Sequence, residues 1–249
     1  MKTREVLVLS VLSLSLHTAA LAAPVVFEAA GPTAADIQDA VDDFRDFLGP
    51  LNPNAIGSFP SGRREINWDA VPDAFAAPNS LPPGFFNANS PRGAVFLTPG
   101  SGFQVSADSA NPTNTPILFG NLQPLFPLRF RAFSPERLFT ALGSNLVETI
   151  FFVPGSTEAA TVTGFGVVFT DVNSADSTRI EFVNARGSVF FSKNVLPGGT
   201  EPGTFSFLGV AFDGGERAYV VRIISGSLAP VRDIVMMDDF IYAEPQPAP

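Results

Sequence analysis

The chain has 249 residues, with 25 Phe, 23 Pro, 21 Gly, a single His and no Cys. A hydrophobic content of 45% with only 16% charged residues is too apolar for a disordered chain, and the lack of Cys excludes disulfides, thiolate zinc sites and cysteine nucleophiles. Its 15 basic and 24 acidic residues give a net charge of −9, which disfavours nucleic acid as a partner because phosphate binding needs a basic face.

The first 22 residues have the pattern of a secretory signal peptide. Lys2 and Arg4 precede an apolar run, and Ala20-Leu21-Ala22 supplies the small residues that signal peptidase requires. Cleavage after Ala22 predicts a secreted protein, extracellular or periplasmic, whose mature chain keeps no membrane span. An uncleaved anchor helix is the alternative.

Cleavage would also limit the chemistry of the mature chain. The only His, His17, lies in the predicted signal peptide, and removal of that segment leaves 13 basic and 23 acidic residues, a net charge of −10. A chain with neither His nor Cys forms no Ser-His-Asp triad, no Cys-His pair and no His- or Cys-ligated metal site.

An amphipathic helix is predicted at about residues 33–48. Thr33 and Asp36 have the spacing of a capping box, apolar residues recur every three or four positions, and Gly49-Pro50 ends the helix. Four aspartates lie mostly off the apolar face, where they form either a solvated surface or one that attracts cations: Asp39, Asp42, Asp43 and Asp46.

The rest of the chain is predicted to be loops and strands. Residues from about 50 to 92 are rich in Pro, Asn, Gly and Ser and predict a loop-rich insert around one short strand. Beyond Gly93, turn residues separate short runs rich in Val, Ile and Phe, which predicts an all-β fold: an antiparallel β-sandwich of the jelly-roll type. We expect one domain over residues 23–244 and a Pro-rich tail at 245–249. The expected strands after the insert are Ala94–Thr98, Gly102–Ser106, Leu146–Val153, Val162–Thr170, Thr178–Val183, Ser188–Ser192, Phe205–Phe212, Ala218–Ser225 and Ile234–Ala243.

The last predicted strand carries two aspartates among apolar residues. Strict alternation puts Asp238 on a face with Ile234, Met236, Phe240 and Tyr242, and Asp239 on the other. A carboxylate on such a surface needs a cation, an Arg or several N–H donors. Three interpretations remain open: ion pairs with Arg222 or Arg217 or bonds to loop backbone, a bound Ca²⁺, and a catalytic carboxylate.

A second group of polar residues surrounds the only Trp of the chain. An aromatic ring beside amide, acid and guanidinium groups suits a sugar, which stacks through its C–H face and bonds through its hydroxyls. The alternative is a Trp packed in the core with surface ion pairs around it. The candidate ligand-binding residues are Arg64, Asn67, Trp68, Asp69 and Arg92.

Several segments resemble an uncharacterised family of secreted bacterial jelly-roll proteins. The resemblance rests on Gly164–Val172, Ile180-Glu181-Phe182, Phe207–Val210 and the closing Asp-Asp-Phe-Ile-Tyr strand, with Gly62–Asp69 and Ser90–Gly93 upstream. More distantly, the arrangement is similar to galactose-binding-like and carbohydrate-binding modules. That likeness implies a structural Ca²⁺ held by Glu28 and by Asp238 or Asp239.

These observations favour a secreted, non-catalytic module that binds an extracellular glycan or another polyhydroxylated ligand, with Ca²⁺ as a structural cofactor. The first alternative is a structural or adhesive exoprotein that meets only other proteins. The second is a glycan hydrolase or lyase, because Glu148, Glu181 and Asp239 could meet across the sheets.

Overall fold

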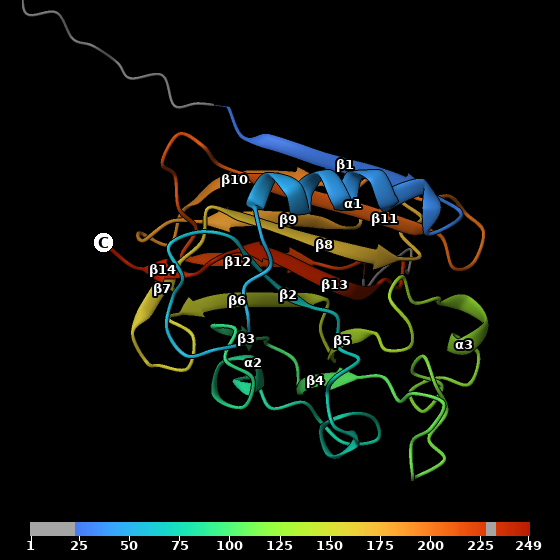
Figure 1. The fold of residues 1–249 in the computed structure, drawn as a ribbon. Helices are drawn as coiled ribbons and strands as arrows, with labels where there is room; N and C mark the ends of the chain where they lie inside the picture. The colour runs from blue at the N-terminus through green and yellow to red at the C-terminus, as the bar shows by residue number, and fades with distance from the viewer. Residues whose placement is uncertain (1–22, 228–232) are drawn as a thin grey trace, which may run out of the picture.

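The computed structural model describes residues 23–227 and 233–249, so the predicted signal peptide lies outside the described residues. Two antiparallel sheets pack face to face, with one helix along the outer side of the first sheet (Figure 1). This arrangement confirms the predicted all-β sandwich.

The first sheet has the strand order β1-β11-β8-β13-β5-β4. Strand β2 pairs with the C-terminal half of β13, and β5 pairs with its N-terminal end. Its strands are β1 (Val25–Gly31), β2 (Arg63–Ile66), β4 (Gly102–Val105), β5 (Phe139–Leu142), β8 (Gly164–Thr170), β11 (Phe205–Ala211) and β13 (Met236–Ala243).

The second sheet has the order β10-β9-β12-β6-β7-β14, with β3 paired to β6. From β8 to β13 the chain changes sheet at almost every connection, as in a jelly roll. The strands are β3 (Ala94–Leu97), β6 (Leu146–Phe152), β7 (Ala159–Thr161), β9 (Arg179–Val183), β10 (Val189–Asn194), β12 (Val220–Ile224) and β14 (Gln246–Pro247). Part of the predicted Pro-rich tail therefore belongs to a sheet edge, where proline is tolerated.

The predicted helix is present as α1 (Ala35–Leu48). Only half of the expected capping box forms: the Asp36 carboxylate accepts from the Thr33 backbone N–H at 2.8 Å, while the Thr33 hydroxyl donates to that same carboxylate instead of capping the backbone. Three short elements in the loops were not expected: the helices α2 (Phe85–Ala88) and α3 (Phe126–Arg129) and a 3₁₀ turn at Asp73–Phe75. No helix in the described ranges is long and apolar enough to cross a membrane.

Helix α1 covers the first sheet through Ile37, Val41 and Phe44. The Phe44 ring lies against Gly209 of β11 and Gly166 of the neighbouring strand β8. A Cβ added at either glycine would lie 2.8 Å from the ring. These two glycines are therefore needed for the close approach of helix and sheet.

A β-bulge interrupts β13. Met237 pairs with Phe169 but Phe240 pairs with Val167, so two residues of β13 lie opposite one residue of β8. The predicted alternation is wrong here: Val235 and Met237 face the interior together with Phe240 and Tyr242, because the extra residue reverses the side-chain parity.

Candidate functional site

The insert builds a cavity of about 310 Å³ against the edge of the sandwich. Asn67 and Trp68 reach it from the segment directly after strand β2, and Phe85 and Phe86 from helix α2. The segment after that helix brings Asn89, Ser90 and Arg92. The strand is held in place by its pairing with β13 through Ile66 and Phe240, so the cavity wall is anchored to the sheet.

Trp68 forms part of the closed floor of this cavity. Its side chain is 1% exposed, its ring stacks on Phe139 with centroids 4.1 Å apart and planes 3° from parallel, and its Nε1–H donates to the Asp238 carbonyl at 2.8 Å. The backbone adopts a φ of +67°, which is unfavourable for Trp and is held by these contacts. The predicted stacking platform at Trp68 is therefore wrong, because core aromatics cover the ring.

The rim of the cavity is polar and largely unpaired. Asn54, Asn67 and Asn89 are exposed, and within the described residues their side-chain amides make no hydrogen bond. Each amide offers two donors and one acceptor oxygen. Three free amides therefore surround an apolar floor made by Val71, Phe85 and Phe86.

Arg92 lines the cavity as a half-buried cation. Its Nε–H donates to the Glu65 carbonyl at 2.9 Å, Nη1 bonds to the Ser90 hydroxyl, and the guanidinium lies 5.3 Å above the Phe86 ring. Burial lowers the pKa of Arg92. In the described part of the chain it has no carboxylate partner, so one edge of the guanidinium remains available to a ligand.

Two other predicted ligand-binding residues are used elsewhere. Arg64 is completely buried, forms a two-point ion pair with Glu244 at 2.6 and 2.8 Å, and donates to the Pro53 carbonyl at 2.5 Å, so its role is structural. Asp69 accepts from the Arg137 backbone N–H at 3.1 Å, and burial raises the pKa of Asp69. Neither side chain lines the cavity.

Asp238 and Asp239 form a buried carboxyl pair, 0% and 2% exposed. The bulge lets both consecutive side chains reach the Ser134 hydroxyl, which lies 3.1 Å from Asp238 and 2.6 Å from Asp239. Asp238 also accepts from the Phe133 N–H at 2.6 Å, and Asp239 pairs with Arg45 of α1 at 3.2 Å. The expected bonds to loop backbone are thus present, and Arg45 is the ion-pair partner in place of Arg222 or Arg217.

Burial and mutual repulsion disfavour the ionised form of these two carboxyl groups. Burial and the adjacent Asp239 raise the pKa of Asp238 well above its usual value, and burial also raises the pKa of Asp239, against the opposing effects of Ser134 and Arg45. The stronger upward shift of the Asp238 pKa favours its protonated form, while Asp239 is the member of the pair that contacts Arg45. Carboxyl oxygens that already accept hydrogen bonds from protein donors are poorly placed to bind Ca²⁺.

Glu28 does not join this pair. It lies on β1, which two strands separate from β13, so the two strands are about 14 Å apart at normal strand spacing. Phe27 packs on the helix side of the sheet, so Glu28 points the other way, to Lys193 of the second sheet at 3.1 Å. Glu28 and Asp239 therefore face opposite sides, and no cluster of three or more His, Cys, Asp or Glu suited to a metal occurs within the described residues.

The three candidate catalytic carboxylates, Glu148, Glu181 and Asp239, do not come together in one site. Glu148 on β6 and Glu181 on β9 flank Arg222 of β12 in register, and both pair with it, at 2.7 and 3.1 Å. Asp239 belongs to the other sheet. These acids form a cross-strand ion pair on one sheet face, not a carboxylate pair across a cleft.

Asn54, Asn89 and Phe85 line the cavity although the sequence pattern did not indicate them. They lie in the loop-rich insert, where Asn and Pro are ordinary turn residues and no spacing marks those that converge. Searches against family models, curated proteins and solved structures found no match to this chain.

Proposed function

We propose that this protein is a secreted, non-catalytic module that binds an extracellular glycan or a similar polyhydroxylated ligand in the cavity beside Trp68. The observation that carries the proposal is the ring of unpaired amides of Asn54, Asn67 and Asn89 around an apolar floor. Sugar hydroxyls both donate and accept, and so do carboxamides. The resemblance of several segments to secreted jelly-roll proteins, and the more distant likeness of the arrangement to carbohydrate-binding modules, supports the same function.

Shape and charge also favour a small neutral or weakly acidic sugar unit. The cavity of about 310 Å³ has the size of a small ligand site, and its only charged lining group is Arg92. The sugar C–H face would lie over Phe85 and Phe86, not over the covered Trp68 ring. Calcium at Asp238 and Asp239 is not part of the proposal, because their oxygens are occupied by protein donors.

A glycan array followed by calorimetry on the best ligand tests the proposal. Asn67→Ala and Asn89→Ala are each expected to weaken binding about two- to tenfold, the effect of one lost hydrogen bond. Asn194→Ala, at an exposed position on β10, is the matched control and should bind as the unchanged protein does. Equal affinity of the cavity variants and the control, or no bound glycan, would refute the proposal.

A second candidate is an exoprotein whose surface meets other proteins. It is favoured by three exposed leucines at a spacing of three residues, Leu122, Leu125 and Leu128, which are 43%, 62% and 77% exposed. Light scattering of the purified protein tests this candidate: self-association that Leu125→Ser together with Leu128→Ser abolishes would support it, and a monomer at all concentrations would count against it.

A further inference from the structure

A second cavity, of about 330 Å³, lies beside the turn between β11 and β12, separate from the one at Trp68. Its apolar wall consists of Phe190, Phe191 and Phe212, whose rings lie 5.0 Å (Phe190) and 5.9 Å (Phe191) from that of Phe212. A β-bulge in β10 allows two consecutive phenylalanines to contact the same ring. The wall is therefore suited to an aromatic or large aliphatic group.

Two uncompensated charges of opposite sign line the same cavity. Glu216 makes no hydrogen bond or ion pair within the described residues, and its Oε2 is buried. A buried carboxylate oxygen without a donor is unfavourable, and native proteins usually supply a partner. Glu216 therefore lacks a cation or an N–H donor that a bound molecule could provide.

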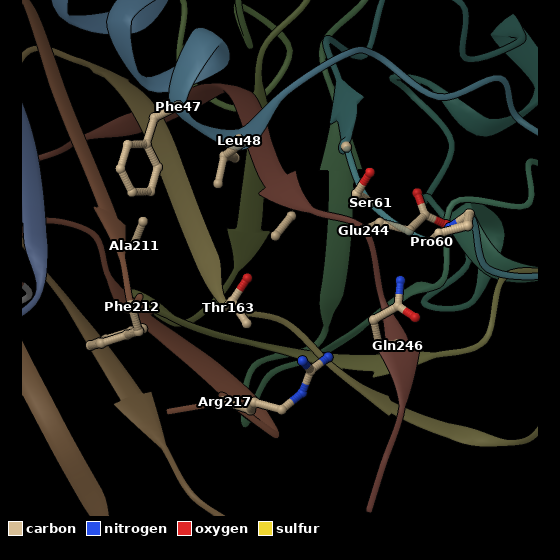
Figure 2. Close-up of a pocket in the computed structure, with 12 residues that line it drawn as sticks. Phe47, Leu48, Pro60, Ser61, Thr163, Ala211, Phe212, Arg217, Glu244 and Gln246 are labelled. Atoms are coloured by element: carbon tan, nitrogen blue, oxygen red, sulfur yellow. The ribbon is translucent and has the colours of Figure 1, made fainter. Parts of the chain in front are cut away.

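Arg217 lacks the complementary partner. Its Nε and Nη2 donate to the Thr161 hydroxyl and carbonyl at 2.5 and 3.1 Å, which fixes the guanidinium and leaves Nη1 unused. Among the described residues no carboxylate pairs with it. Arg217 and Phe212 also line an adjoining cavity of about 230 Å³. Figure 2 shows both side chains at this second cavity.

We propose that this cavity binds a small zwitterion with an apolar body, an α-amino acid with an aromatic or large aliphatic side chain. The ammonium would pair with Glu216, the carboxylate with Arg217, and the side chain would lie on the three phenylalanines. A simple carboxylate would be repelled by Glu216, and a simple amine by Arg217. Only a ligand with both charges compensates both groups.

Titration of the purified protein with L-phenylalanine tests the proposal, with N-acetyl-L-phenylalanine and L-phenylalaninamide as single-charge analogues. We expect L-phenylalanine to bind with a Kd of about 1 mM or lower, and each analogue to bind about ten- to a hundredfold more weakly, because each loses one charged hydrogen bond. No binding of L-phenylalanine at about ten times that concentration, or equal binding of all three compounds, would overturn the proposal.

Variants of Glu216 and Arg217 test which charge of the ligand each residue recognises. Glu216→Gln should remove the preference for L-phenylalanine over its N-acetyl form, and Arg217→Gln should remove the preference over the amide. Asp213→Asn and Arg186→Gln change exposed residues nearby that do not line the cavity, and should leave both preferences unchanged. Preferences that survive both cavity variants would refute the assignment, and the analogue series on the unchanged protein remains decisive even if a variant fails to fold.

Discussion

Replacing Asp238 with asparagine tests whether the buried pair on β13 carries a single proton. The amide keeps an acceptor oxygen for the Phe133 N–H and a donor toward Asp239, which are the bonds that the protonated carboxyl makes. We therefore expect Asp238→Asn to change the free energy of unfolding at neutral pH by about 1 kcal/mol or less.

Asp238→Ala provides the contrast in magnitude. It leaves the Phe133 N–H and one bond of Ser134 without an acceptor in a completely buried site, at about 1–3 kcal/mol for each group. The expected loss is about 3 kcal/mol or more, with an additional contribution from the cavity.

The dependence on pH gives the sharper test. Because the folded-state pKa of Asp238 is raised above 3.8, its contribution to stability is fully present below about pH 4 and is lost as the pH rises through the folded pKa. The asparagine variant does not titrate at this position, so its stability relative to the unchanged protein should improve as the pH rises.

Urea unfolding of both proteins from about pH 5 to pH 9 measures this difference. The idea of a single proton on the pair would be refuted if the difference in unfolding free energy between the two proteins stayed constant over that range. It would also be refuted if Asp238→Asn lost as much stability as Asp238→Ala at every pH. Circular dichroism and the denaturant slope establish that both proteins unfold from the same folded state.

Three further predictions follow from packing and ion pairing. Gly209→Ala should lower stability by about 1–3 kcal/mol in thermal unfolding, because its Cβ would lie 2.8 Å from the Phe44 ring, and unchanged stability would show that the helix is not held so closely. Arg64→Met should cost about 3–5 kcal/mol by leaving Glu244 buried without its cation, and a loss below about 1 kcal/mol in chemical unfolding would mean that the pair is hydrated. Millimolar Ca²⁺ should not raise the Tm relative to excess chelator, whereas a rise of about 5 °C or more that Asp239→Asn abolishes would restore the calcium interpretation.

The local patterns of the sequence determined much of the fold. The period of the apolar residues predicted α1, and Gly49-Pro50 its end, because helical periodicity and backbone stereochemistry act within a few residues. The alternation of apolar residues between turn signals predicted the sandwich for the same reason. Strands β1 and β5 and the short strands β7 and β14 were missed, since their pairing with distant strands outweighs a weak local pattern.

The candidate sites depended on contacts between distant parts of the chain. Ser134 and Arg45 meet Asp239 across 105 and 194 residues, and the bulge that brings Asp238 to the same hydroxyl depends on the pairing of β13 with β8. The composition of the chain, by contrast, already determined which chemical groups were available. Tertiary structure alone decided which were buried, paired or left free around a cavity, because desolvation and hydrogen bonding depend on neighbours that chain order does not specify.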